Sequence, residues 1–181
     1  MNIMTTNSKR EFSSFRDPSG CVFVENHEIF RRIAPSYFEQ YRALMNGLYD
    51  ELVKFNALIP HQEIHADENE ILIKPERIPF ISYPYEWSFG ELKDAALLTL
   101  KIHRRAMKHN LILKDASAYN IQFRNGQPVL IDTLSFDFYQ DGEPWGAYGQ
   151  FCRHFLVPLL LMSYKDIRLN KLLSLFIDGI P

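Results

Sequence analysis

The amino-acid sequence predicts an α+β fold in which a small antiparallel sheet with one long helix precedes a helical part carrying a β-hairpin. Three observations lead to this prediction. Short β-like runs come early in the chain, at 21–26, 28–33, 71–74 and 78–83. Apolar residues recur every three or four positions over 37–58, which is typical of an amphipathic helix. Later, an Asn125-Gly126 pair between two apolar runs favours a two-residue hairpin turn.

The other elements follow from periodicity and turn residues. A helix over 91–109 has acidic residues early and basic residues late, which suits the helix dipole. A mostly apolar helix over 144–165 contains Pro158, so we expect a kink there. A last amphipathic helix is expected over 167–177. We therefore divide the chain into a flexible tail (1–20), a β-rich part with a connector (21–87) and a helical part (88–181) with the hairpin at 121–132.

Composition narrows the classes of partner. The chain has 181 residues and a net charge of −2, so nothing predicts nonspecific binding to nucleic acid or to an anionic membrane. Its 2 cysteines, Cys21 and Cys152, lie far apart in the sequence, which favours free thiols in a reducing cytoplasm. We find no apolar segment of signal-peptide length at the N-terminus, and the run at 155–162 is too short to span a bilayer. These features predict a cytoplasmic protein.

Three polar residues around the hairpin carry most of the functional prediction. Asp115 precedes Asn120 by five positions, and Asp132 follows the hairpin. Phosphoryl transfer needs a base beside the acceptor hydroxyl and oxygen ligands for Mg²⁺ on the phosphates. The hairpin register places Asn120 opposite Ile131 and so brings Asp132 near Asn120. Strict alternation would put the two side chains on opposite faces, so they can share an ion only if one leaves the regular ladder.

Asp and Asn are also common turn residues and helix caps, which is the simpler explanation of a bare Asp-x4-Asn spacing. The hairpin and the terminal Asp make the full set more specific. A second candidate, the His61-x3-His65 pair, could bind a metal if it lay on a helix. Pro60 and the polar surroundings instead favour a solvent-exposed loop over 61–70.

The set Asp115-x4-Asn120, hairpin, Ile131-Asp132 resembles the catalytic loop and metal-binding aspartate of protein kinase-like folds, and most closely the aminoglycoside- and choline-phosphotransferase branch. The resemblance implies a reduced N-lobe and a truncated helical C-lobe. It also implies ATP and Mg²⁺ as cofactors, Asp115 as the catalytic base, and Asn120 and Asp132 as metal ligands.

The chain departs from that family's pattern at several positions. Leu113 stands where the family usually has His, and the first β-turn contains no glycine that would bring backbone N–H groups onto phosphates. Arg31 and Arg32 stand in the strand where a lysine is expected, with Glu39 or Glu51 as possible ion-pair partners. The candidate cofactor-binding residues are Arg31, Arg32 and Lys114. Arginine can bind phosphate bidentately.

A second resemblance covers the later part of the chain. The stretch VLIDTLSFDFYQDGEPWGAYGQFCRHFLVPLLLM and the ending IDGIP are similar to bacterial proteins related to a nodulation protein. That family implies a following class I S-adenosylmethionine-dependent methyltransferase domain. The glycine-rich strand and turn of such a domain is not found in these 181 residues. The resemblance thus predicts a following C-terminal partner domain, with S-adenosylmethionine binding in that domain.

Two interpretations of function remain open from the sequence. In one, the chain is a kinase-like, degenerate domain (a pseudokinase) that serves as a binding or regulatory module of a longer methyltransferase-like protein. In the other, it is an ATP- and Mg²⁺-dependent phosphotransferase that acts on a small molecule. The glycine-free turn and the missing lysine favour the first, and the three retained polar residues favour the second.

Overall fold

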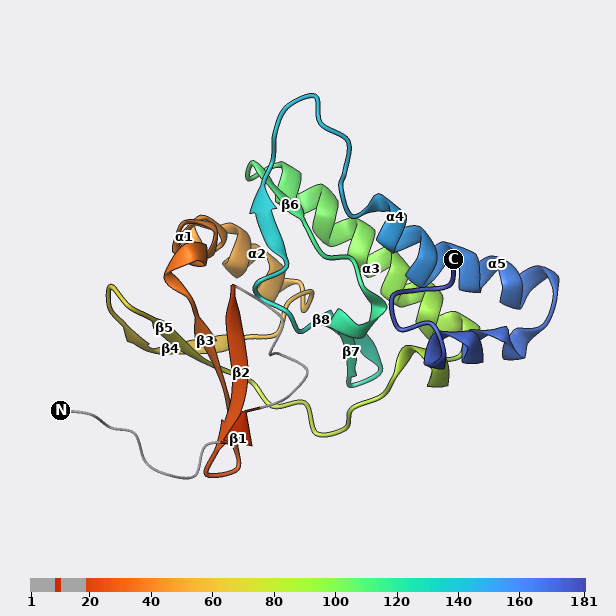
Figure 1. Ribbon diagram of the computed structural model, residues 1–181, viewed down its shortest axis with the longest axis horizontal. Coiled ribbons are helices and arrows are strands. Elements are labelled where there is room, and N and C mark those ends of the chain that lie inside the picture. The colour runs from red at the N-terminus through yellow and green to blue at the C-terminus, as the bar shows by residue number, and fades with distance from the viewer. Residues whose placement is uncertain (1–8, 11–18) are drawn as a thin grey trace. The chain divides into compact units, whose positions relative to one another are not determined.

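The computed structural model describes residues 9–10 and 19–181 (Figure 1). These residues divide into two compact units. The first unit contains the described residues up to Arg42 and residues 60–77, and the second contains residues 43–59 and 78–181. The predicted α+β class, with a small antiparallel sheet and a helical part that carries a hairpin, is confirmed. Most of the predicted tail, residues 1–8 and 11–18, lies outside the described residues.

The first unit is built on an antiparallel sheet. Within the described residues, its 5 strands follow the order β1-β2-β3-β5-β4. The strands are β1 (Lys9–Arg10), β2 (Gly20–Glu25), β3 (Glu28–Ile33), β4 (His61–Ala66) and β5 (Ile71–Pro75). β2 and β3 pair from Gly20 opposite Ile33 to Glu25 opposite Glu28. The turn residues Asn26 and His27 both have positive φ, at 50° and 65°, as a tight two-residue hairpin requires.

The long helix predicted over 37–58 is divided in two, which corrects the prediction. A 3-10 turn, η2 (Pro35–Tyr37), leads into α1 (Phe38–Met45), and α2 (Leu48–Lys54) follows. Gly47 has a φ of +96°, which no residue of a right-handed helix adopts. The apolar periodicity continues across this break, so the pattern alone could not reveal it.

Two β predictions are also corrected. The segment expected as a loop over 61–70 begins with strand β4, whose polar residues suit an exposed edge of the sheet. The run at 78–83 is not a strand. Proline at position 79 removes a ladder donor, and the Ser82 N–H instead donates to the Gln122 side chain at 3.0 Å.

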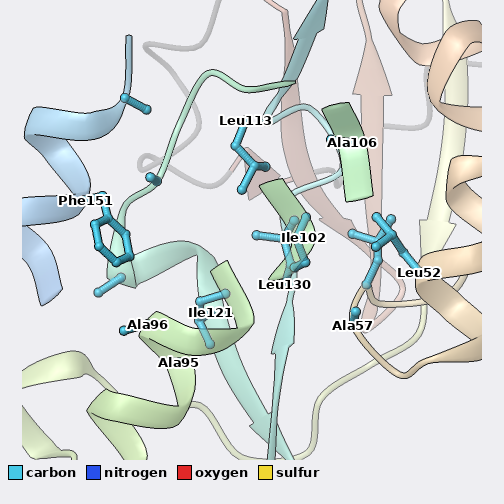
Figure 2. Packing of buried hydrophobic residues seen from close by; sticks show 14 of the residues in the cluster. Leu52, Ala57, Ala95, Ala96, Ile102, Ala106, Leu113, Ile121, Leu130 and Phe151 are labelled. Atoms are coloured by element: carbon cyan, nitrogen blue, oxygen red, sulfur yellow. The ribbon is translucent and has the colours of Figure 1, made fainter. Parts of the chain in front are cut away.

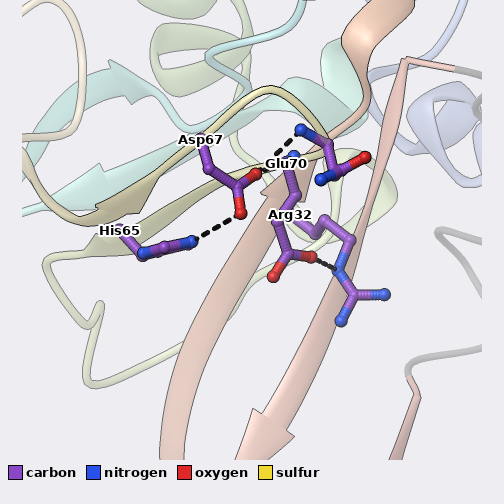
Figure 3. A network of polar contacts seen from close by, with 5 residues as sticks. Arg32, His65, Asp67 and Glu70 are labelled. Carbon is purple, nitrogen blue, oxygen red and sulfur yellow. Dashed lines mark hydrogen bonds and ion pairs between the residues drawn. The ribbon is translucent and has the colours of Figure 1, made fainter. Parts of the chain in front are cut away.

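The β4–β5 turn is held by a small polar network (Figure 3). The Asp67 carboxylate accepts hydrogen bonds from the backbone N–H groups of Asn69 at 2.8 Å and Glu70 at 2.9 Å. Its other oxygen lies 3.1 Å from His65 Nε2. These contacts lower the pKa of Asp67, with the Glu70 and Asn69 backbone bonds as the main causes. His61 and His65 therefore belong to strand β4, and His65 also contacts the turn through Asp67. Within the described residues, no group of three or more His, Cys, Asp or Glu side chains could hold a metal ion.

The core of the second unit forms around helix α3 (Phe89–Met107). Ser88 caps this helix, since its hydroxyl accepts from the Glu91 N–H and the Glu91 carboxylate accepts from the Ser88 N–H. The buried face of α3 carries mostly small residues, which let other elements approach closely. Figure 2 shows this cluster, with side chains from α2, α3, β6 and the hairpin. Its buried α3 members are Leu92, Ala95, Ala96, Ile102 and Ala106.

The predicted hairpin is present. β7 (Ile121–Arg124) pairs with β8 (Gln127–Leu130), and Asn125 and Gly126 form the turn with φ values of 52° and 74°. A second pair, β6 (Leu111–Leu113) with β9 (Phe136–Phe138), brackets the hairpin and was not predicted. The two pairs place residues 114–120 and 131–135 between strand ends, where the candidate polar residues lie.

The C-terminal helices differ from the sequence prediction in their start and in their type. The helix expected over 144–165 begins with α4 (Tyr148–Phe151), continues as a π-helix, η5 (Cys152–Leu156), and ends with α5 (Val157–Tyr164). Pro158 lacks an N–H for the carbonyl four residues earlier, which explains irregular helix at this point. The last helix is a 3-10 segment, η6 (Ile167–Ser174).

Gly179 secures the end of the described chain. Its φ is +91°, and a Cβ at this position would lie 2.5 Å from the Arg153 Cβ. The following residue, Ile180, donates its N–H to the Arg153 carbonyl at 3.0 Å. Only glycine therefore lets residues 179–180 lie against the π-helix.

The first unit contains a histidine whose protonation we expect to destabilise the fold. Burial, together with the charge of Arg31, lowers the pKa of His61 to about 4. Its Nε2 lies 3.0 Å from the Tyr41 hydroxyl. The unfolded chain binds a proton on this histidine near pH 6.5, whereas the folded chain does so only near its lowered pKa.

We therefore predict that the free energy of unfolding decreases as the pH falls from 6.5 to 4, by on the order of 3 kcal/mol from His61 alone. Urea denaturation at several pH values would compare the wild type with His61→Gln, which cannot titrate. The stability advantage of the wild type should shrink across this window. Parallel pH profiles for the two proteins would show that His61 does not carry the effect.

Candidate functional site

The candidate polar residues lie in the two segments that connect the paired strands of the second unit. Asp115 follows β6, Asn120 ends the 3-10 turn η4 (Ala118–Asn120), and Asp132 follows β8. Ser117 caps η4, since its hydroxyl accepts from the Tyr119 N–H at 3.2 Å. The side chains of Asp115, Asn120 and Asp132 are half-buried, so solvent and ligands can reach them.

Asn120 and Asp132 come together through the hydroxyl of Ser135. The Asn120 amide nitrogen donates to Ser135 Oγ at 3.3 Å, and Ser135 Oγ donates to Asp132 Oδ2 at 2.5 Å. The Asp132 Oδ1 accepts from the Leu134 N–H at 3.1 Å. The two side chains predicted as metal ligands are thus joined by one shared partner, although 12 positions separate them in the sequence.

Asn120 and Asp132 lie outside the regular strand ladder, so the alternation of side chains between its two faces does not separate them. The predicted register is correct, because the Ile131 N–H donates to the Asn120 carbonyl at 2.8 Å. The strands, however, extend only from Ile121 to Leu130. Asn120 belongs to a 3-10 turn and Asp132 to a turn of its own, so neither obeys the two-residue period of the ladder.

Asp115 is fixed by two donors that bind the same carboxylate oxygen. Its Oδ1 accepts from the Ser117 N–H and from Gln150 Nε2, each at 2.9 Å. The side-chain oxygen of Gln150, Oε1, in turn accepts from the Ala116 N–H at 2.7 Å. Gln150 of α4 therefore orients the loop by a pair of reciprocal bonds. Both bonds to the carboxylate use Oδ1, so Oδ2 can accept a proton from a ligand.

Ser135 also anchors the strand that leads into this loop. Its carbonyl accepts from the Lys114 N–H at 2.8 Å. The Lys114 side chain is exposed beside Asp115. The sequence predicted Asp115, Asn120 and Asp132 as site residues and did not indicate Ser135 or Gln150, which bind them in the structure. The spacing Asp132-x2-Ser135 suggests a turn in which a side chain binds nearby backbone. Nothing in the sequence around Gln150 indicates its role, because its partners lie about 35 positions away.

A buried histidine lies in the electrostatic field of Asp115. His154 of the π-helix is 1% exposed, and its ring meets the Tyr119 ring edge to face at 6.1 Å. Burial lowers the pKa of His154, and the negative charges of Asp115 and Asp178 oppose this only in part. Burial therefore favours the neutral form of His154 next to the site.

The arginines proposed for phosphate binding lie in the first unit, on β3. Arg32 Nε forms an ion pair with the Glu70 carboxylate at 2.6 Å (Figure 3). Glu51, one of the two partners considered for these arginines, instead pairs with Arg105 and His109 of the second unit. These contacts, with the His109 bond first, lower the pKa of Glu51. Glu51 is thus excluded as a partner, and it serves to tie α2 to the end of α3.

A cavity of about 260 Å³ lies elsewhere in the second unit, beside α3 and β9. His103 and Trp145, which stack with ring centroids 4.1 Å apart, form part of its wall. The lining does not include Asp115, Asn120 or Asp132. We base the candidate site on the polar convergence at Ser135 rather than on this cavity, because cavity size alone indicates no chemistry. No helix in the described part of the chain has the length and apolarity needed to cross a membrane.

Comparisons with known proteins place the chain in a wider context. No protein-family model matches it. It is 40% identical over 179 residues to Nodulation protein NoeA of Rhizobium meliloti (strain 1021), an alignment that covers 95% of this chain and 37% of that protein. The chain therefore spans little more than a third of the length of this relative. The predicted relation to a nodulation protein is confirmed. The solved structure of vaccinia related kinase 3 is similar with a TM-score of 0.47 and 13% identity, over 68% of this chain and 46% of that one.

We predict that Gln150→Ala destabilises the protein by about 1–2 kcal/mol, because the Ala116 N–H and the Asp115 carboxylate each lose a partner. Gln150→Glu keeps an acceptor for Ala116 but places a second carboxylate against Asp115. The Glu variant should therefore lose more stability at pH 7 than at pH 4, where carboxylates become protonated. Chemical denaturation at the two pH values measures both effects. Equal stability of wild type and Gln150→Ala would show that Gln150 does not hold the loop.

Proposed function

We propose that this chain is a kinase-like module that binds a nucleoside triphosphate, with ATP as the expected ligand, together with Mg²⁺. The observation that carries the proposal is the convergence of Asn120 and Asp132 on the Ser135 hydroxyl. An amide oxygen and a carboxylate are hard oxygen donors of the kind that Mg²⁺ prefers, and Mg²⁺ usually binds through one or two protein side chains and the phosphates. When bound, the ion would neutralise negative charge on the phosphates.

The residues present fit such an ion in chemistry and in exposure. Asp132 and Asn120 would hold it, and both side chains are half-buried above buried neighbours, with Thr133 1% and Leu134 2% exposed. Lys114, next to Asp115, is the candidate group for the phosphates within the second unit. Arg32 belongs to the first unit and pairs with Glu70 at 2.6 Å, so a phosphate would have to compete with that carboxylate for it.

The turn between β2 and β3 in the first unit favours a regulatory or binding role over rapid turnover. The β2–β3 turn uses Asn26 and His27 in place of glycines, so its backbone approaches a ligand less closely than a glycine-rich turn. The nodulation relative is much longer than this chain, since the aligned residues make up 37% of it. We propose that the module acts within a longer protein, and that any S-adenosylmethionine-dependent methyl transfer belongs to another domain.

Phosphoryl transfer to a small-molecule hydroxyl is the second candidate function, and the state of Asp115 favours it. Gln150 and the Ser117 N–H both bind Oδ1 and so orient the carboxylate, and Oδ2 would accept the proton of an acceptor hydroxyl. A carboxylate held in this way matches the role of a general base. Asp115→Asn would abolish turnover in this case while leaving nucleotide binding in place.

A thermal-shift titration with ATP, with and without Mg²⁺, tests the binding proposal. We predict that ATP with Mg²⁺ at 100 times the Kd stabilises the protein by about 2.7 kcal/mol, and that ATP alone does less. Asp132→Asn should remove the Mg²⁺-dependent part, because it deletes the charge but keeps the shape. Asp94→Asn, an exposed position on α3 with the same change in charge, is the matched control and should respond like the wild type.

No stabilisation of the wild type at millimolar ATP and Mg²⁺ would rule out the nucleotide site. Release of ADP in the presence of candidate acceptors separates the two functions. Turnover that disappears in Asp115→Asn supports the phosphotransferase, and binding without turnover supports the regulatory module.

A further inference from the structure

We propose that Ser135 is a positioning residue that fixes the orientation of the Asn120 amide and so presents its carbonyl oxygen to a divalent cation. This inference rests on the proposed metal site and adds to it a residue that no sequence motif indicates. The Ser135 hydroxyl has one proton to donate in a hydrogen bond.

The Ser135 hydroxyl donates this proton to the Asp132 carboxylate. An ionised carboxylate can only accept hydrogen bonds, so the 2.5 Å contact between Ser135 Oγ and Asp132 Oδ2 requires the serine to donate. The serine then has only acceptor capacity for its contact with Asn120. Asn120 must therefore direct its NH₂ group, and not its carbonyl oxygen, at Ser135 Oγ, over 3.3 Å.

The orientation of the amide has a chemical consequence. The nitrogen and oxygen of the amide diverge from the same trigonal Cγ atom, so an NH₂ group that is bound to Ser135 leaves Oδ1 pointing in a different direction. A metal ion binds the oxygen and is repelled by the NH₂ hydrogens. The hydrogen-bond order Asn120 to Ser135 to Asp132 thus selects the amide orientation in which residue 120 can act as a ligand.

Ser135 is well placed to hold this orientation. It is 0% exposed, and its carbonyl is bound to the Lys114 N–H at 2.8 Å. The next residue, Phe136, starts β9, which pairs with β6. Because Ser135 is buried and its proton is committed to Asp132, we assign it to orientation of the ligands rather than to direct coordination.

Mn²⁺, added with ATP, is the probe for the test. We expect Ser135→Ala to weaken Mn²⁺ binding about 10- to 100-fold, as loss of an outer partner of a metal ligand does. Asn120→Ala should weaken it as well. Ser135 binds Asp132 and also orients Asn120, so Ser135→Ala should cost less in the Asn120→Ala background than in the wild type, by the part that acts through Asn120. Electron paramagnetic resonance of free Mn²⁺ gives the four affinities.

Ser82→Ala is the matched control. Its hydroxyl accepts from Trp87 Nε1 at 2.9 Å, so this variant also loses one hydrogen-bonded hydroxyl of the second unit. It should bind Mn²⁺ like the wild type. Ser135→Cys keeps the volume and a weaker donor, and its affinity should lie between those of the wild type and Ser135→Ala. The Cys variant carries the test if Ser135→Ala does not fold.

A metal-free measurement separates failure of this inference from failure of the proposed function. The Asn120 side-chain amide, identified in ¹⁵N spectra by its loss in Asn120→Asp, should show slowed hydrogen exchange that Ser135→Ala abolishes. Slowed exchange together with wild-type protein that binds no Mn²⁺ would overturn the metal site but keep the assigned orientation. Unchanged Asn120 exchange in Ser135→Ala, or full additivity of the two alanine substitutions on Mn²⁺ affinity, would overturn the role of Ser135.

Discussion

Ser135 connects the three segments that carry the candidate polar residues. Its carbonyl binds the N–H of Lys114, beside Asp115, and its hydroxyl binds both Asn120 and Asp132. A buried residue with this many partners allows little displacement of any one segment, because each lost bond would leave a buried polar group without compensation. The geometry of the candidate site therefore depends on the position of this one residue.

The packing of the second unit sets that position. Small residues on the buried face of α3 let the hairpin and the β6–β9 pair lie close to the helix (Figure 2). The hairpin is also tied to the segment before β4, since the Leu130 N–H donates to the Ala57 carbonyl at 2.9 Å and the Ile59 N–H donates to the Leu130 carbonyl at 2.8 Å. Gln150 of α4 donates a hydrogen bond to the Asp115 carboxylate. A rigid helical frame thus supports polar loops, which is how binding sites are commonly built.

Local chemistry made part of this structure predictable. The Asn125-Gly126 pair predicted the hairpin and its register, and the acidic first turn predicted a helix from residue 91, although α3 begins slightly earlier, at Phe89. Periodicity could not show the break at Gly47, since apolar positions continue through it. Strict alternation would separate Asn120 and Asp132 unless one of them left the regular ladder, and in the structure both lie outside the strands, which extend only from Ile121 to Leu130. The spacing Asp132-x2-Ser135 indicates only a local turn. The bonds from Asn120 to Ser135 and from Gln150 to Asp115 join segments that lie 15 and 35 positions apart, for which a single sequence contains no signal.

Anomalous diffraction from crystals grown with ATP and Mn²⁺ tests the central claim most directly. The structure predicts a Mn²⁺ peak at about 2.0–2.3 Å from an Asp132 carboxylate oxygen and from Asn120 Oδ1, close to the distances that Mg²⁺ adopts. The Asn120 nitrogen should remain bound to Ser135 Oγ. A Mn²⁺ ion held by other side chains, or by the nucleotide alone with Asp132 still bound only to Ser135 and Leu134, would contradict the assignment of this site.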